Sequence, residues 1–125
     1  MLTSSKQPRK QRKARLEARL HERQHLAHAH MSKELRAKLK TKRRSIEVRK
    51  GDRVKILRGE HKGKSGKVTS VDLNGLKIYV EGALHRKAKG NEVPAPLDPS
   101  NVVIVDADFG DKWRRKILER SAKTT

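Results

Sequence analysis

The sequence has no cysteine and very few aromatic residues. Without cysteine, disulfide bonds and thiolate metal sites are excluded. Aromatic residues make up 2% of the chain, namely Tyr79, Phe109 and Trp113. They are too few for a protein that reads single-stranded bases on several stacking platforms. The hydrophobic fraction is 33%, so we expect only a small buried core.

Long apolar runs are also missing. We find no segment of transmembrane length and no amphipathic stretch with bulky aromatic anchors. The first residues, MLTSSKQPRKQRK, lack the apolar segment of a secretory signal. A membrane is therefore not expected as a partner.

Acidic residues are scarce relative to basic ones. The chain contains 33 Lys and Arg against 14 Asp and Glu, a net charge of +19. So many like charges repel one another in a compact protein, and a polyanion would compensate them. The composition therefore predicts a nucleic-acid partner, bound through its phosphates and the shape of a folded RNA.

The charge divides the chain into unlike parts. Residues 1–50 hold 17 Lys and Arg against 4 acidic residues, a net of +13, and residues 51–125 hold 16 against 10, a net of +6. Branched aliphatic residues are nearly absent before Ile46, so residues 1–47 are predicted to be a basic extension without a core of its own. Helices are expected from Gln11 to His30 and from Ser32 to Lys40, with Ser32 as N-cap. Removal of residues 1–31 is expected to leave the remainder folded.

Strand patterns begin near Val48. Alternating or short apolar runs bounded by turn residues occur at 53–57, 67–72 with a bulge, 76–80, 84–86 and 102–105. Asn74-Gly75 predicts a two-residue hairpin turn. Short strands with glycine turns and no intervening helix indicate a mainly β fold, a small SH3-like antiparallel barrel over residues 48–105. Residues 106–125 are predicted to form a C-terminal helix, capped by Asp111, and a tail.

The segment GEHKGKS at 59–65 resembles a phosphate-binding Walker A loop with one residue too few. The sequence after Ser65 predicts a strand, whereas a Walker A loop opens a helix whose N-terminus holds the phosphate. Nucleotide hydrolysis is therefore not expected. Gly59, Gly63 and Gly66 instead predict a tight exposed loop that offers backbone amides and cations to an RNA backbone. The alternative is a plain hairpin with solvated lysines.

A family resemblance supports the RNA interpretation. The stretch VRKGDRVKILRGEHKGKSGKVTSVD (48–72) resembles a KOW motif, which implies an SH3-like barrel bound to RNA or to the transcription and translation machinery. The flanks SKELRAKLKTKRRSIEVRKGD and KIYVEGALHRKAKGNEVPAPLDPSNVVIV resemble the archaeal and eukaryotic large-subunit ribosomal proteins of the universal L-twenty-four family, whose eukaryotic member is numbered twenty-six. The short C-terminus favours the archaeal branch. The alternative is a KOW-containing transcription elongation adaptor that binds RNA and polymerase.

The resemblance implies a structural constituent of the large ribosomal subunit, located in the cytoplasmic ribosome. It implies contacts with the 5′ region of the large-subunit ribosomal RNA and with neighbouring ribosomal proteins, a role in starting subunit assembly, and a position near the nascent-peptide tunnel exit. Nascent chains or exit-site factors are further expected partners. A small-molecule substrate, a cofactor and catalysis are not expected, because no nucleophile–base or acid–base pair is recognisable.

Basic charge and the resemblance together predict the RNA-binding residues. In the N-terminal arm they are Arg9, Lys10, Arg12, Lys13, Arg15, Arg19 and Arg23. In the basic approach to the barrel they are Ser32, Lys33, Arg36, Lys42, Arg43 and Arg44. Around the KOW loop they are Arg49, Lys50, Arg58, His61, Lys62, Gly63, Lys64 and Lys67. After YVEG they are His85, Arg86 and Lys87.

Three other groups of residues have two interpretations. His21, His25 and His28 would share a face of the predicted helix, which could indicate a metal site. However, there is no matching carboxylate to complete such a site, so we expect imidazoles that face RNA or solvent. Asp106, Asp108 and Asp111 lack the glycine and glutamate of a calcium loop, so a polar turn and a helix cap are expected. Trp113 is expected to pack on the barrel, with stacking on a base as the alternative.

Overall fold

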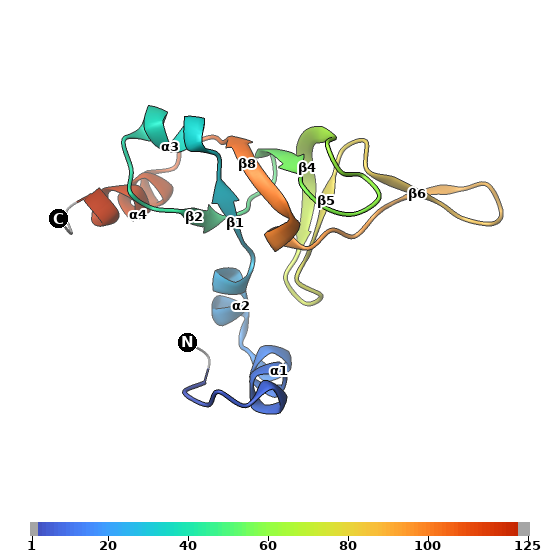
Figure 1. Ribbon diagram of the computed structural model, residues 1–125, viewed down its shortest axis with the longest axis horizontal. Helices are drawn as coiled ribbons and strands as arrows, with labels where there is room; N and C mark the ends of the chain where they lie inside the picture. The colour runs from blue at the N-terminus through green and yellow to red at the C-terminus, as the bar shows by residue number, and fades with distance from the viewer. Residues whose placement is uncertain (1–2, 123–125) are drawn as a thin grey trace.

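The centre of the computed structural model, which describes residues 3–122, is a six-stranded sheet (Figure 1). Its strands lie in the order β2-β1-β8-β3-β4-β5. They are β1 (His28–Met31), β2 (Ser45–Glu47), β3 (Arg53–Ile56), β4 (Ser65–Asp72), β5 (Lys77–Val80) and β8 (Val102–Asp106). All pairings are antiparallel except β1 with β8, which is parallel. The arrangement is compatible with the predicted small SH3-like fold. It differs from the predicted antiparallel barrel because the sheet is mixed and its edge strands β2 and β5 do not pair with each other.

The remaining elements surround this sheet. The helices are α1 (Pro8–Glu17), α2 (Leu20–Leu26), α3 (Lys33–Leu39) and α4 (Lys112–Ala122), and a 3-10 turn η1 spans Pro99–Asn101. Strands β6 (Leu84–Arg86) and β7 (Glu92–Pro94) form a separate hairpin. In Figure 1 this hairpin points away from one end of the sheet, α3 and α4 lie at the other end, and α1 and α2 extend to one side.

Alternating apolar residues form the core. Val54 and Ile56 from β3, Ile78 from β5 and Ile104 from β8 are at most 1% exposed and belong to one cluster. Their polar neighbours in β3 point outward, as the period of two predicted. The expected irregularity in β4 is confirmed as a register shift between Val68 and Ser70.

The basic extension contributes to this core, contrary to expectation. Residues 28–30 are not helical, because they form most of β1, which pairs with β2 on one side and β8 on the other. Ala27, Ala29 and Met31 are at most 3% exposed, and Ile46 from β2 is 1% exposed. Long-range strand pairing thus overrides the local helix preference, and removal of residues 1–31 would remove a strand from the middle of the sheet.

Two local predictions have opposite outcomes. Ser32 is the N-cap of α3, where its hydroxyl accepts a hydrogen bond from the Leu35 amide at 3.1 Å, as predicted. The prediction of a two-residue turn at Asn74-Gly75 is wrong, because Asp72 pairs with Lys77 and four residues connect β4 to β5. In this longer turn Leu76 takes the positive φ of 53° and buries its side chain.

Candidate nucleic-acid interface

The loop between β3 and β4, residues 57–64, is closed by its own backbone. The Gly63 amide donates to the Ile56 carbonyl at 2.8 Å, and the Lys62 and Lys64 amides donate to Gly59 and His61 at 3.2 and 3.1 Å. Gly59 and Gly63 adopt φ values of 96° and 88°, which permit this tight path. The amides of Lys62, Gly63 and Lys64 are therefore used within the loop, so the expectation that the loop offers its amides to RNA does not hold for these three.

Cations are what the loop presents to solvent. Arg58, Lys62, Lys64 and Lys67 are all exposed. Strand β4 begins at Ser65, directly after Lys64, so the helix of a Walker A site is replaced by a strand. A rigid loop with three outward cations, next to the exposed Lys67 of β4, is suited to phosphate contacts along a polyanion.

His61 supports the loop from inside. It is 7% exposed, and its Nδ1 lies 3.3 Å from the Lys64 ammonium nitrogen. Its Nε2 is buried without a hydrogen-bond partner among residues 3–122. Gly66, at the loop's base, is packed so tightly that an added Cβ would collide with the Glu81 carbonyl oxygen. These contacts fix the loop against the sheet.

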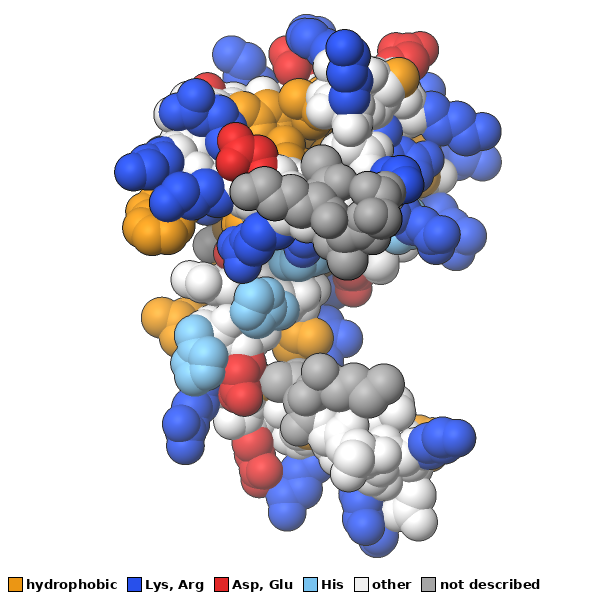
Figure 2. Space-filling view, turned by 90° about the vertical axis from the view of Figure 1, so that its left-hand side faces the viewer, with side chains coloured by type: hydrophobic (Ala, Val, Ile, Leu, Met, Phe, Trp, Pro, Cys, Tyr) orange, Lys and Arg blue, Asp and Glu red, His pale blue; other side chains and the backbone are white. Residues whose placement is uncertain are grey.

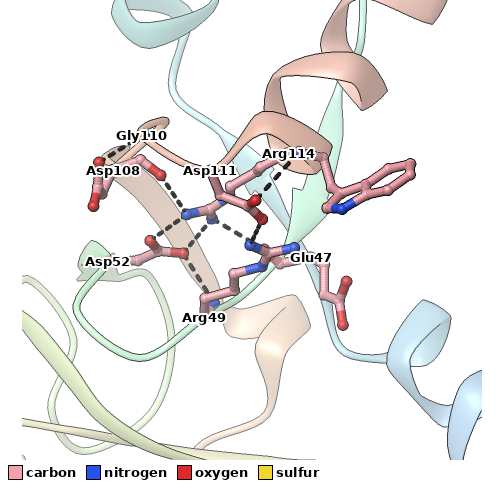
Figure 3. Close-up of polar contacts among 8 residues, drawn as sticks. Glu47, Arg49, Asp52, Asp108, Gly110, Asp111 and Arg114 are labelled. Atoms are coloured by element: carbon pink, nitrogen blue, oxygen red, sulfur yellow. Dashed lines mark hydrogen bonds and ion pairs between the residues drawn. The ribbon is translucent and has the colours of Figure 1, made fainter.

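A buried ion pair anchors the segment before β3 (Figure 3). Arg114 on α4 donates to both carboxylate oxygens of Asp52, at 2.8 and 2.5 Å, and the two residues are 2% and 1% exposed. Arg114 also donates to the carbonyls of Asp108 and Glu47, at 3.1 and 3.2 Å. One guanidinium thereby joins β2, the start of β3 and the segment before α4.

A second, exposed pair lies beside it (Figure 3). Arg49 donates to Asp111 at 2.6 Å, and this hydrogen bond holds the pKa of Asp111 below its usual value. The Asp111 carboxylate also accepts from the Trp113 amide at 3.2 Å, which confirms the predicted helix cap. Arg49 therefore has an intramolecular partner, whereas the neighbouring Lys50 is exposed.

The predicted residues of the N-terminal arm likewise include both exposed cations and an arginine that bonds within the chain. Arg9, Lys10, Arg12, Lys13, Arg15 and Arg19 are exposed on α1 and at the start of α2. Arg23 instead donates to the carbonyls of Leu16 and Ala18 at 2.7 and 2.9 Å and to that of Asn74 at 2.6 Å. It ties the two short helices to each other and to the β4–β5 turn.

The remaining predicted residues lie at two ends of the molecule. At the α3 end, Lys33, Lys42 and Arg44 are exposed, whereas Arg43 donates to the Ser45 carbonyl at 3.0 Å. The Nε atom of Arg36 is buried without a partner among residues 3–122. At the opposite end, the β6–β7 hairpin exposes three consecutive predicted residues, which are His85, Arg86 and Lys87.

A cationic hollow of about 190 Å³ lies where the arm meets the sheet. It is lined by His25, His28, Arg43, Ile46, Glu47, Ile117 and Arg120. The rings of His25 and His28 meet edge to face, with centroids 6.0 Å apart. Burial, followed by the charges of Arg43 and His25, lowers the pKa of His28 below 6.5. Figure 2 shows histidines on the neck between the arm and the body.

Replacing His28 by Gln should make the protein less sensitive to acid. Because the pKa of His28 is lower in the folded state, the unfolded chain binds a proton more readily. Its contribution to stability is therefore retained above pH 6.5 and lost as the pH falls through the folded pKa. The thermal midpoint should fall less in His28→Gln than in wild type between roughly pH 7.5 and 5.5. His85→Gln, on the exposed hairpin, is the control, and an identical fall in all three proteins would refute the assignment.

Residues 3–122 contain neither a membrane-spanning helix nor a cluster of metal ligands. None of the helices there is long and apolar enough to cross a membrane. Likewise, no three His, Asp or Glu side chains of that part converge as metal ligands do. His28 lies in a strand, so the helical face proposed for His21, His25 and His28 does not form.

Sequence reasoning missed the Asp52–Arg114 pair and the exposure of Trp113. No signal for the pair is visible in the sequence, because Arg114 is followed directly by Arg115 and only the fold shows which of the two is buried. Trp113 precedes Arg114 and is 67% exposed, so the expectation that it packs on the barrel is wrong.

Comparison with known proteins places these features in a family context. A family model for the eukaryotic ribosomal proteins L26 and their archaeal counterparts, numbered twenty-four, matches residues 5–121. Among similar proteins, the large ribosomal subunit protein uL24 of Methanothrix thermoacetophila is 52% identical over 116 residues. The aligned part covers 93% of this chain and 98% of that relative.

Proposed function

Because the chain belongs to the family of ribosomal proteins that comprises eukaryotic L26 and its archaeal counterparts, we propose that its exposed cations bind large-subunit ribosomal RNA. The chain is a structural ribosomal protein and not an enzyme. Its cellular place is the large subunit of the cytoplasmic ribosome. The family match spans nearly the whole chain, so it replaces the alternative of an elongation adaptor.

The observation that carries this proposal is the rigid, cation-bearing β3–β4 loop. The amides of Lys62, Gly63 and Lys64 are bonded within it, and its base is packed against the sheet at Gly66. Arg58, Lys62, Lys64 and Lys67 therefore project from a fixed frame, which lowers the entropy lost when they meet phosphates. Exposed cations of the arm and of the α3 end extend the contact surface, while Arg23, Arg43, Arg49 and His61 act by positioning these segments.

Three finer proposals rest on the family resemblance. We propose contacts with the 5′ region of the ribosomal RNA, an early role in subunit assembly, and a location near the tunnel exit. The β6–β7 hairpin, which extends furthest from one end of the sheet in Figure 1, is the element we propose for exit-site factors or nascent chains.

Neutralising the loop cations should flatten the salt dependence of RNA binding. The variant replaces Arg58, Lys62, Lys64 and Lys67 by Gln and is titrated with protein-free large-subunit ribosomal RNA by filter binding. Each lost phosphate contact reduces the slope of log K against log salt by roughly 0.7–0.9, so the slope should become shallower by about 3.

A matched control carries the same loss of charge elsewhere. Lys6, Lys38, Lys40 and Lys89 are exposed, lie outside the predicted contact set and belong to neither of the strands that flank the loop. Replacing these four by Gln should change the slope much less than the loop variant does. Equal slopes for the two variants would show that only net charge matters and that the loop has no special role.

A further inference from the structure

Trp113 is the single tryptophan of the chain, and its side chain is 67% exposed. It lies in the first turn of α4, which buries Arg114 and Leu118 on another face. An indole has a large apolar surface, and leaving most of it in water forgoes its burial. The exposed tryptophan is therefore a candidate for contact with another molecule.

The surroundings of Trp113 are cationic. The Lys116 ammonium nitrogen lies 4.6 Å from the indole ring centroid, and Lys112 and Arg115 are exposed on the same helix. A hollow of about 380 Å³ beside the ring is lined by Trp113, Lys116, Glu119 and Arg120. Such a combination of a flat π surface with neighbouring positive charge is what unpaired bases and their phosphates bind.

This hollow adjoins the one at the neck. Arg120 lines both, and the second hollow adds Arg43 and His28. Lys and Arg side chains project from much of the face seen in Figure 2, which views the molecule from the side of α3 and α4. The cationic surface therefore continues from Trp113 towards the arm.

We infer that Trp113 stacks on an unpaired base of the ribosomal RNA, with Lys116 and Arg115 at the flanking phosphates. Lys116 occupies one face of the indole, and the ring's other face receives the base. The alternative is that Trp113 inserts into a hydrophobic pocket of a neighbouring protein, but the centres of protein–protein interfaces are depleted of charged residues. Here the hollow beside the ring contains two cations and one carboxylate. The inference rests on the proposed RNA-binding function and adds α4 to the RNA-contacting surface.

The single tryptophan makes the site directly observable. Intrinsic tryptophan fluorescence of the full chain reports only Trp113, so stacking on a base should quench it when protein-free large-subunit ribosomal RNA is added. The affinity for the same RNA should fall about 5- to 100-fold in Trp113→Leu, which keeps apolar bulk but has no π face. Trp113→Phe keeps a ring and should lose less. All three proteins should have the same thermal midpoint, because the side chain is exposed.

The outcomes separate this inference from the proposed function. Equal RNA affinity of wild type and Trp113→Leu, or wild-type binding without a change in fluorescence, would overturn the stacking site and leave RNA binding standing. Unchanged affinity of Trp113→Leu for RNA alone, together with weaker incorporation of that variant into large subunits, would identify a protein neighbour and also overturn the inference. Failure of the wild-type chain to bind the RNA at all would contradict both the stacking site and the proposed RNA-binding function.

Discussion

Replacing Asp52 by Ala should lower the free energy of unfolding by about 3–5 kcal/mol, because the substitution leaves the buried Arg114 guanidinium without its counter-charge. This loss is a large fraction of the roughly 5–15 kcal/mol that stabilises a typical domain. The Arg49 amide, which donates to Asp52 at 2.9 Å, would lose its acceptor as well. Urea unfolding followed by circular dichroism measures the change.

A double-mutant cycle separates the pair from its surroundings. Asp52→Leu and Arg114→Met should each destabilise strongly, because each leaves the partner's charge buried without a counter-charge, whereas the variant with both substitutions should recover much of the loss. Lys13→Met, which removes an exposed ion pair to Glu17 on α1, is the control and should have little effect. Additive losses at positions 52 and 114 would contradict the assignment of the pair as a coupled anchor.

Truncation should have very different results on either side of β1. A chain that begins at Ala27 loses α1 and α2, which bury no residue, and with them eight Lys and Arg against two Glu. It should unfold cooperatively with a midpoint close to that of the full chain. Its affinity for large-subunit ribosomal RNA should fall, and the salt slope should flatten by roughly 0.7–0.9 for each phosphate contact removed.

Removing only five more residues should destroy the fold. A chain that begins at Ser32 lacks β1, so β2 loses its neighbour in the sheet and β8 loses one of its two partners. The buried Met31 side chain alone is worth about 2–5 kcal/mol by analogy with large-to-small core substitutions. Circular dichroism and thermal unfolding of the two truncations test this. A cooperative transition in the shorter chain would show that β1 is dispensable.

Local patterns in the sequence predicted much of the sheet. The alternation at Val54 and Ile56, the irregularity in β4 and the cap of α3 at Ser32 all arise from neighbours in sequence. The family could be named from the sequence because the motif at 48–72 and its flanks occur together, and the comparison confirms it.

Features that depend on distant partners could not be predicted in this way. His28–Met31 follows a run of good helix formers and becomes a strand only because β2 and β8 flank it. Asp52 and Arg114 are 62 residues apart, and nothing near either position indicates its partner. Glycine spacing likewise does not reveal that the amides of Lys62, Gly63 and Lys64 bond within the loop.

Sedimentation of the tagged full-length chain from its own cells tests the central claim most directly. We expect it at one copy per large subunit in a sucrose gradient, retained at moderate salt and released together with other proteins only at high salt. Its absence from large subunits, with the tagged chain remaining at the top of the gradient at every salt concentration, would contradict the account.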